Sequence, residues 1–431
     1  MVAASATVTL DNVKRHSHPY PVVRTYLSSL RAKTRVVAIA SAGLASLVLT
    51  LLSMSLQSLD AIIVFGISLT LCLLGLIKPL RSWFREVGEL QPQQIGPVDL
   101  TRLVLEDSLL QSNFVPIVRM NSNDDVLVSS REVNQLLWSG VPIELRQSRR
   151  HFRTVLDPPA FVVLLDKFAK DRKAILFNGR KVRMATELKA HDSHLEPVTV
   201  QRTTYFDGLV TNESAMIQLV LRSHPQLEPV YSGLSYNFPR GALPACDESA
   251  SSNQIGVSTI AITRDFRLVI QQQGSENAID PGKQGPSGSG SADWADVKGK
   301  TNFNEVVIGA ARRELVEECG LSVESVDRLQ ILGYGRLMKR GGLPEFYCFA
   351  KLRCDAEEIS IVRPERHLVE RHVFLEIPLE RTTMAYEIHQ TVNELLKGNS
   401  SQMGSSLWWN LWMLGQVSIS ELEQFLVSDG D

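Results

Sequence analysis

Cysteine is scarce in this sequence, and so is any large excess of charge. The 431 residues include five cysteines, which show no paired spacing. This pattern excludes a disulfide scaffold and argues against a cysteine-ligated zinc site, so a reducing compartment suits the chain. The formal net charge is only −2, whereas dedicated nucleic-acid-binding proteins usually carry a basic excess. We therefore expect no specific nucleic-acid partner.

The charge that is present is unevenly distributed. Residues 1–90 carry nine basic and four acidic side chains, an excess of +5, so the rest of the chain carries −7. Hydrophobic residues make up 44% and charged residues 21% of the sequence, which excludes both a disordered polymer and a fully membrane-buried transporter. The length is sufficient for two or three domains with a sizeable core.

Two uncharged segments lie close together near the N-terminus. Residues 36–56 form a run of 21 uncharged residues, and residues 61–77 form a run of 17. A helix of 21 residues is about 31 Å long, which matches the hydrocarbon core, and 17 residues is the short end of the spanning range. Only residues 57–60 separate the two runs. The sequence therefore predicts an antiparallel transmembrane hairpin within residues 36–86, inserted in a lipid bilayer.

The orientation of this hairpin follows from its flanks. Basic residues precede the first run and follow the second, and the connecting turn has none: Arg31, Lys33, Arg35, Lys78, Arg81, Arg85. The positive-inside rule then places both the N-terminal segment 1–35 and everything after residue 78 in the cytoplasm. We expect a multi-pass membrane protein with two spans. The alternative is a buried helical hairpin in a soluble core; a cleaved signal peptide fits poorly, because a long segment precedes the first run.

Residues 90–250 contain both helix-like and strand-like patterns and predict an α+β middle domain. The sequence does not indicate the role of this domain. Residues 174–177 and 181–184 flank an Asn-Gly pair, a pattern that predicts a β-hairpin. The short polar block 247–253 is typical of a domain boundary. We found no internal repeat.

The residue pattern that is informative about function begins after this boundary. Residues 255–263 and 268–273 predict strands, and residues 306–319 predict a helix with Gly320 at its C-terminal cap. A loop rich in glycine, serine and proline separates the second strand from the helix. The arrangement predicts an α/β domain over residues 255–431.

Three glutamates share one face of the predicted helix. Glu314, Glu317 and Glu318 lie at positions i, i+3 and i+4, so their like charges are destabilising without a partner. Mg²⁺ and Mn²⁺ are hard ions that prefer such carboxylate oxygens. We also expect Arg313 to reach back to Glu305 and fix the preceding loop. A solvated acidic helix face is the alternative that the residue pattern alone leaves open.

The spacing of these residues resembles the Nudix hydrolase superfamily. Residues 299–321 match the full Nudix box, which reads Gly, five residues, Glu, seven residues, then Arg-Glu-hydrophobic-x-Glu-Glu-x-Gly-hydrophobic. The resemblance covers about residues 255–388. It implies a Nudix-type α/β/α sandwich in the C-terminal part. The expected fold is therefore α/β, with this sandwich preceded by the transmembrane helical hairpin and the α+β middle domain.

The resemblance also implies roles for individual residues. Glu314, Glu317 and Glu318 would be the ligands of a divalent metal, Mg²⁺ or Mn²⁺, and Glu317 and Glu318 would belong to the catalytic set with Glu305 and Arg313. Glu305 would pair with Arg313 and assist metal binding or the activation of water. Members of the family hydrolyse a nucleoside diphosphate linked to another moiety, X. The expected partner is thus a nucleoside diphosphate-linked small molecule.

Two features around the box leave alternatives open. The approach to the box, residues 286–294, lacks the Pro-Gly-Gly and acidic residue that many members have. This Gly/Ser run either offers backbone N–H groups to a pyrophosphate or is a flexible loop. Many members recruit one more carboxylate from beyond the box, and Glu365 and Glu370 are the candidates here.

Two further clusters follow the box. Arg336, Lys339 and Arg340 lie around a predicted hairpin turn, where they either contact phosphates or are solvated. The tryptophan-rich stretch 406–414 is too short to span a membrane. We expect it to cover the sheet or the middle domain, with a membrane-surface contact as the alternative.

The leading hypothesis is a membrane-anchored Nudix hydrolase that cleaves a pyrophosphate bond in a nucleoside diphosphate derivative with a divalent metal. The alternative is a membrane-tethered nucleotide-binding sensor with a Nudix fold and little or no turnover. A structural or interaction role centred on residues 90–250 is neither supported nor excluded by the sequence.

Overall fold

The computed structural model describes residues 82–120, 122–171, 176–274, 282–360, 369–378, 383–398 and 401–427. The predicted cytoplasmic segment 1–35 and the predicted transmembrane runs 36–56 and 61–77 lie outside these residues. Within the described ranges, every helix is too short or too polar to cross a bilayer. The hairpin therefore stays a prediction.

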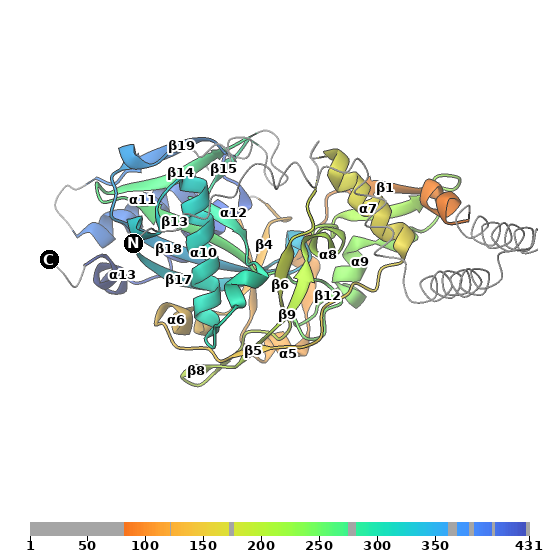
Figure 1. Cartoon of the computed structure of the whole chain (residues 1–431), viewed down its shortest axis with the longest axis horizontal. Coiled ribbons are helices and arrows are strands. Elements are labelled where there is room, and N and C mark those ends of the chain that lie inside the picture. The colour runs from red at the N-terminus through yellow and green to blue at the C-terminus, as the bar shows by residue number, and fades with distance from the viewer. Residues whose placement is uncertain are drawn as a thin grey trace, which may run out of the picture.

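A nine-stranded mixed sheet forms the centre of the protein (Figure 1). Its main path runs β15-β14-β13-β18-β17-β4-β3, with β16 paired to β13 and β19 paired to β14. β13 and β18 run parallel, and the other neighbours run antiparallel. The strands are β3 (Val115–Val118), β4 (Val126–Ser129), β13 (Gly256–Ile262), β14 (Arg267–Gln273), β15 (Gln284–Gly285), β16 (Gly288–Ser291), β17 (Val326–Leu337), β18 (Leu343–Leu352) and β19 (Val369–Glu376).

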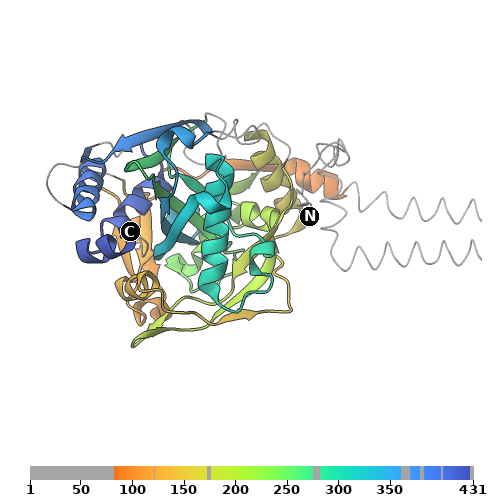
Figure 2. The ribbon, with the colours of Figure 1, turned by 60° about the vertical axis from the view of Figure 1, so that its left-hand side comes forward.

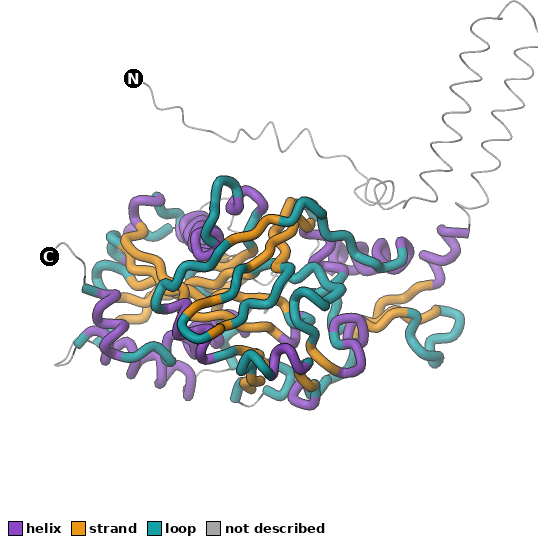
Figure 3. The backbone as a smooth tube through the Cα atoms, turned by 90° about the horizontal axis from the view of Figure 1, so that it is seen from below, coloured by secondary structure: helices purple, strands orange, loops and turns teal. Residues whose placement is uncertain are grey.

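Helices cover both faces of this sheet, as Figures 2 and 3 show from two further directions. On one face lies α10 (Phe303–Cys319), and on the other lie α11 (Met384–Gly398), α12 (Ser405–Leu414) and α13 (Ile419–Leu426). Strand β18 explains the two cores, because successive side chains point to opposite faces. Phe346 and Cys348 join the core under α10, whereas Tyr347 and Phe349 join the core under α12. The predicted three-layer α/β/α arrangement of the C-terminal part is confirmed.

The tryptophans of α12 belong to the second core. Trp408 and Trp409 are 3% and 0% exposed, and their rings meet edge to face with centroids 4.6 Å apart. The Trp409 indole N–H donates to the Asp125 carboxylate at 2.9 Å, so its polar end is satisfied as burial requires. The prediction that this stretch covers the sheet is confirmed.

Most of residues 82–254 lie outside this sheet, and α7 and β1 mark the far end of the elongated molecule in Figure 1. A helix spans residues 82–89, and two three-stranded sheets follow, in the orders β1-β10-β11 and β5-β9-β6. A separate core joins α7 and α8 to β1 and β10. The elements are β1 (Leu90–Gln94), β5 (Leu145–Gln147), β6 (Arg180–Met184), β9 (Val198–Thr204), β10 (Ile217–Leu221), β11 (Tyr231–Ser232), α5 (Asp107–Leu110), α6 (Arg131–Trp138), α7 (Pro158–Asp171), α8 (Tyr205–Val210) and α9 (Gly233–Asn237). Two short strand pairs complete this part: β2 (Val104–Leu105) with β12 (Ala242–Leu243), and β7 (Ala190–His191) with β8 (His194–Leu195).

The β-hairpin predicted around Asn178-Gly179 is wrong. Residues 181–184 do lie in a strand, β6, but β6 pairs with β9, and residues 176–179 are not in a strand. The turn residues have another task at the N-terminus of α8. The Asn178 side chain accepts the Phe206 N–H at 2.9 Å, and the Gly179 carbonyl accepts the Tyr205 N–H at 2.9 Å. Orphan donors of that helix end thereby find partners.

The central sheet extends across the boundary predicted near residue 250. β3 and β4 come from the predicted middle domain, yet β4 pairs with β17 through Leu127 and Val128. The end of the polar block 247–253 is buried, with Ser251, Ser252 and Asn253 all 0% exposed. These side chains and backbone groups bond to residues 203–237, as the contact of 2.8 Å from the Asn253 N–H to Asn212 illustrates. This end of the block is polar because it is a hydrogen-bonded junction, whereas Asp247 and Glu248 at its start are exposed.

The basic turn after β17 belongs to the same junction. Arg336 is 0% exposed and its guanidinium donates to Glu187 at 2.5 Å, so both interpretations offered by the sequence are wrong for this residue. Arg340 pairs with Glu213 from the loop after α8. Lys339, which is half exposed, pairs with Asp124 at 2.7 Å. The turn therefore holds the two parts of the chain together.

Candidate functional site

The box residues lie on and around α10, and the helix ends are those that the sequence predicts. At the N-terminus the Asn302 side chain accepts the Asn304 N–H, and at the C-terminus Gly320 adopts the left-handed conformation with φ 63°. Glycine is favoured there because other residues are strained at positive φ. Glu305 lies in the first turn of α10, where its carboxylate pairs with Lys300 at 3.1 Å.

Two of the three predicted metal ligands face strand β16. The Glu318 carboxylate accepts the Ser289 N–H at 3.2 Å and the Gln271 amide at 2.9 Å. Glu314 lies against Gly290, where an added Cβ would stand only 2.2 Å from the Glu314 carboxyl carbon. The glycine leaves the room that this carboxylate occupies. The i, i+4 spacing thus does place both side chains on one face, as predicted.

The third glutamate lies at the edge of this face. The Glu317 side chain is 53% exposed, against 14% for Glu314. Its nearest basic partner is Arg313, with an N···O distance of 3.5 Å. Burial raises the pKa of Glu314, while Arg313 and Lys181 oppose the shift and the charge of Glu317 adds to it. The face therefore carries more negative charge than its basic partners neutralise.

Arg313 does not make the predicted pair with Glu305. The two residues are eight positions apart on one helix, about 12 Å along the axis, which is too far for a side-chain contact. Arg313 instead donates to Asp296 at 3.2 Å and to Glu314 at 2.7 Å, and it reaches the Ser291 carbonyl at 3.2 Å. It does fix the loop before the helix, but through Asp296. Burial opposes the charged form, but Glu314 and Asp296 outweigh it and raise the pKa of Arg313.

The Gly/Ser run before the box is ordered as sheet where it is described. Gly288–Ser291 forms β16, and each of its residues pairs with β13. The Ser289 N–H donates to Glu318, so this backbone donor already serves a carboxylate. The interpretation as a flexible loop is wrong for 288–291. Residues 275–281 lie outside the described part of the chain.

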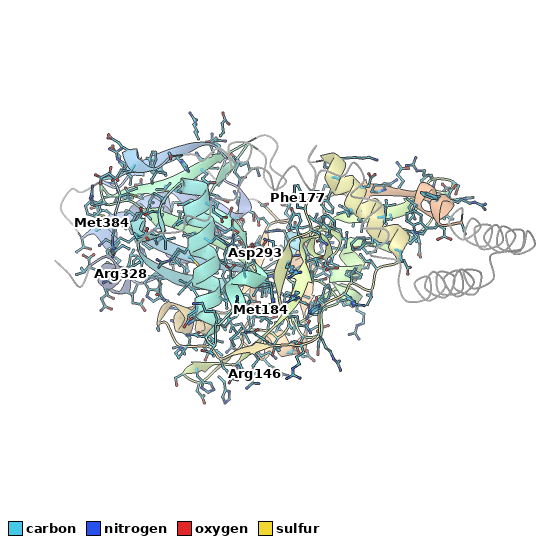
Figure 4. All side chains as sticks on the ribbon, in the orientation of Figure 1. Arg146, Phe177, Met184, Asp293, Arg328 and Met384 are labelled. Carbon is cyan, nitrogen blue, oxygen red and sulfur yellow. The ribbon has the colours of Figure 1, made fainter. Side chains whose placement is uncertain are left out.

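Several residues at the site carry no signal in the sequence. Lys181 comes from β6 in the middle part and forms an ion pair of 2.6 Å with Asp293, which Figure 4 labels beside α10. Asp293 and Asp296 form reciprocal bonds at the ends of a short helix, η3 (Trp294–Val297). His372 on β19 contacts the backbone of Glu318, and burial lowers the pKa of His372. A spatial approach across more than 100 residues leaves no local pattern.

The two candidates for an additional carboxylate differ in what can be said of them. Glu370 is exposed on β19, the strand that also carries His372. Glu365 lies outside the described residues. Neither role is tested, and both stay predictions.

The donor set suits a hard divalent cation in its chemistry, since three carboxylates are available on one helix. In the described part of the chain, however, no group of three or more His, Cys, Asp or Glu side chains converges closely enough to hold a metal. Arg313 and Gln271 occupy carboxylate oxygens that a cation would use. Glu314 lies in the room that Gly290 leaves and the Glu317 side chain is 53% exposed, so the carboxylates share one face of α10 without forming a gathered metal site.

Comparisons with known proteins give fold-level likenesses only. No family model matches the chain, and no curated protein matches it. Among solved structures, a Deinococcus radiodurans protein has 14% identity and a TM-score of 0.26, and the match covers 47% of this chain and 94% of that one. A MutT Nudix hydrolase from Burkholderia pseudomallei has 20% identity and a TM-score of 0.22, covering 30% of this chain and 89% of that one.

A MutT protein from Methanosarcina mazei is also similar, with 8% identity and a TM-score of 0.25, and the match covers 37% of this chain and 91% of that one. At these identities and TM-scores the likenesses carry no argument about activity. The activity of this chain must therefore be inferred from its box residues and from their positions in the fold.

Proposed function

We propose that this chain is a divalent-metal-dependent hydrolase that cleaves a pyrophosphate bond in a nucleoside diphosphate derivative. The observation that carries the proposal is the placement of Glu314 and Glu318 against the glycine strand β16, within a complete box. A solvated acidic helix face would leave both carboxylates exposed, whereas Glu314 is 14% exposed and Glu318 is bonded to two donors. The negative charge is built into the fold at a cost, and that favours a function.

The residues have distinct tasks in this proposal. Glu314, Glu317 and Glu318 would hold the cation, Mg²⁺ or Mn²⁺. Such an ion polarises a phosphoryl oxygen and lowers the pKa of an attacking water. Arg313 positions Glu314 and also the η3 loop through Asp296. This positioning keeps the carboxylate in place before the ligand binds.

The assignment of Glu305 to catalysis has less support. Glu305 precedes Glu314 by nine residues, about 13 Å along the axis of α10, and its side chain is half exposed and paired with Lys300. On a rigid helix this separation keeps Glu305 out of contact with Glu314. Its role in metal binding or water activation stays a prediction.

A test of the catalytic assignment compares Glu317→Gln and Glu318→Gln with the wild type. Each change keeps the side-chain shape but removes negative charge, so turnover is expected to fall on the order of 10²-fold or more and Mg²⁺ affinity is expected to fall with it. Glu324→Gln, just beyond the box in an exposed turn, is the control and is expected to be nearly silent. A nucleotide panel with Mg²⁺ gives the turnover, and calorimetric titration gives the affinity. Wild-type protein that binds no divalent ion at millimolar concentration, with or without nucleotide, would contradict the proposal.

A nucleotide sensor with little turnover is the second candidate, and one observation favours it. Arg313 and Gln271 hold the carboxylates of Glu314 and Glu318 apart, so the described residues do not present a gathered metal site. A protein that only binds its ligand has no need to gather them. The two candidates separate in the same titration, because a sensor shows nucleotide binding without product at any metal concentration.

We also propose that the catalytic part is tethered to a membrane and faces the cytoplasm. The proposal rests on the uncharged runs 36–56 and 61–77 and on the basic flanks. A reporter fused to the C-terminus is expected to be cytoplasmic, and one inserted at Ser58 is expected to be on the other side of the membrane. An external C-terminal reporter contradicts this topology.

A further inference from the structure

A strongly basic segment lies along the outer edge of the β5-β9-β6 sheet. Residues 146–153 include four arginines, Arg146, Arg149, Arg150 and Arg153, all exposed. Among the described residues, Arg146 has a carboxylate partner, Glu144 at 2.8 Å, and the other three have none. Three unpaired guanidinium groups within five residues repel one another, which is a cost unless an anion binds there.

The fold connects this segment to the glutamate site through hydrogen-bonded strands. The Ser148 N–H donates to Val200 and the Phe152 N–H donates to Arg202, both at 2.9 Å, so the segment runs beside β9. β9 pairs with β6, and the Val182 N–H of β6 donates to Ala292 at 3.1 Å. Three strand spacings therefore separate the basic segment from the 291–293 stretch, a span of about 14 Å. In Figure 4 Asp293 is labelled beside α10, Met184 below it, and Arg146 at the lower edge.

Arg202 lies between the basic segment and the site. Its guanidinium is over the Trp294 ring, 5.1 Å from the centroid, and Trp294 begins the short helix η3 that Arg313 binds. The Arg202 Nε is buried and has no hydrogen-bond partner. A buried N–H without a partner is rare in folded proteins, and a missing ligand is one of its explanations. Arg202 thereby adds a positive charge between the basic segment and η3.

The charge pattern around the glutamates gives the reason for such an anion site. The carboxylates of α10 repel any phosphate that approaches them, and only the cation that they are proposed to hold would offset this locally. Lys181 and Arg313, the basic groups nearest the carboxylates, are already committed to Asp293 and Asp296. Positive charge without a carboxylate partner in the residues that the structure describes is found instead on the segment that follows β5, at Arg149, Arg150 and Arg153. A phosphorylated ligand gains most if it spans both regions.

We propose that the basic strip, defined as Arg149, Arg150, Arg153 and Arg202, binds phosphate groups of the nucleotide ligand that lie beyond the bond held at the glutamates. The inference rests on the proposed function and narrows its substrate class to nucleotide derivatives whose moiety X itself carries phosphate. Arginine suits this task because its planar guanidinium bonds two phosphate oxygens at once. The strip contributes affinity for the ligand, whereas the glutamates hold the cation that the cleavage requires.

The test uses the full chain in detergent and inorganic tripolyphosphate as the probe. The strip variant carries Arg149→Gln, Arg150→Gln and Arg153→Gln together. The matched control carries Arg131→Gln, Arg222→Gln and Arg371→Gln, three exposed arginines from other elements that likewise lack a carboxylate partner in the described structure. Both variants lose three positive charges, so any difference between them reports position and not net charge. Thermal unfolding checks that all proteins are folded.

The strip variant is expected to bind tripolyphosphate about tenfold or more weakly by calorimetry, with a shallower salt dependence, whereas the control stays within about twofold of the wild type. With a hydrolysed substrate of the proposed class, KM is expected to rise in the strip variant while kcat is unchanged, because the strip contributes uniform binding. Equal loss in both variants, or no loss in the strip variant, overturns the inference.

Two further arms separate this inference from the proposed function. Glu318→Gln is expected to abolish turnover yet still bind tripolyphosphate, so a failed hydrolase assay leaves the strip measurable. Unchanged turnover with unchanged KM in the strip variant would disprove phosphate binding by the strip. The proposed hydrolase activity would then still stand. A single-stranded oligonucleotide that binds about a hundredfold more tightly than tripolyphosphate, and loses this in the strip variant, would identify a nucleic-acid surface and overturn the assignment.

Discussion

Two arginine–glutamate pairs in this protein have similar chemistry but opposite surroundings. At the junction, Arg336 and Glu187 are both 0% exposed, and Tyr334 donates a further hydrogen bond to Glu187. At the glutamate site, Arg313 and Glu314 are 26% and 14% exposed. The junction pair is sealed between the two parts of the chain, whereas the site pair lies where solvent and a ligand can reach it.

The balance of charge also differs between the two regions. The junction arginine meets one carboxylate. Arg313 lies within 4 Å of four carboxylates, Asp293, Asp296, Glu314 and Glu317. A matched, buried pair is costly to break, whereas a cluster with excess negative charge gains from an added cation. We infer that the first pair maintains the fold, whereas the second belongs to the proposed metal site.

Breaking the junction pair is expected to have the largest effect on stability. Glu187→Ala leaves the Arg336 guanidinium buried without its partner, and such changes cost about 3–5 kcal/mol. Chemical denaturation of the full chain in detergent measures this cost. Asp124→Ala, which breaks the half-exposed pair with Lys339, is the control and is expected to cost less than about 1 kcal/mol. Similar losses in both variants would contradict the assigned difference between buried and exposed pairs.

The junction is also expected to make stability depend on pH. Burial raises the pKa of Glu345 to about 7, an effect that Arg340 opposes and Glu213 reinforces. Between about pH 4.5 and 7 the native state keeps a proton that the unfolded state has lost, so stability falls as pH rises through this window. The loss amounts to at most about 3 kcal/mol. In Glu345→Gln this decline should become shallower when unfolding is measured from pH 4.5 to 8, with a remainder from Glu106, because burial and Glu248 raise the pKa of Glu106 to about 7 as well. A decline as steep as in the wild type would assign it to other groups.

Two glycines of β16 differ in what an added Cβ atom would meet. A Cβ at Gly288 would meet the backbone of Leu315 at 2.6 Å, whereas a Cβ at Gly290 would meet only the end of the Glu314 side chain. Gly288→Ala is therefore expected to destabilise the fold by about 1–3 kcal/mol, since backbone cannot move aside easily. Gly290→Ala is expected to change stability by less than about 1 kcal/mol but to weaken Mg²⁺ binding, because Glu314 must shift. Unfolding and metal titration on both variants test these expectations. A larger loss of stability in Gly290→Ala than in Gly288→Ala, with unchanged Mg²⁺ binding, would contradict them.

The smallest expected effect lies in the interior of α10. Gly309 has nothing within 4 Å of an added Cβ, so Gly309→Ala should stabilise the helix by about 0.5–1 kcal/mol through propensity alone. Thermal unfolding provides the measurement. A destabilised variant would show that α10 needs a flexible point at this position.

The sequence by itself determined the features that depend on neighbours along the chain. The box spacing placed Glu314 and Glu318 on one face of α10, and Gly320 ended that helix. The tryptophan stretch was predicted to cover the sheet, and Trp409 is fully buried against it. These outcomes follow from helix periodicity, capping and apolar patterning, which are local properties that a sequence states directly.

Only the tertiary structure decided which side chains meet across the chain. Arg313 bonds to Asp296 and not to Glu305, because a rigid helix keeps the latter distant while the folded loop brings the former close. Lys181 reaches Asp293 from a different part of the sequence, and residues 251–253 are buried because donors and acceptors elsewhere in the fold satisfy them. Such pairings arise from packing between distant segments, and no local periodicity records them.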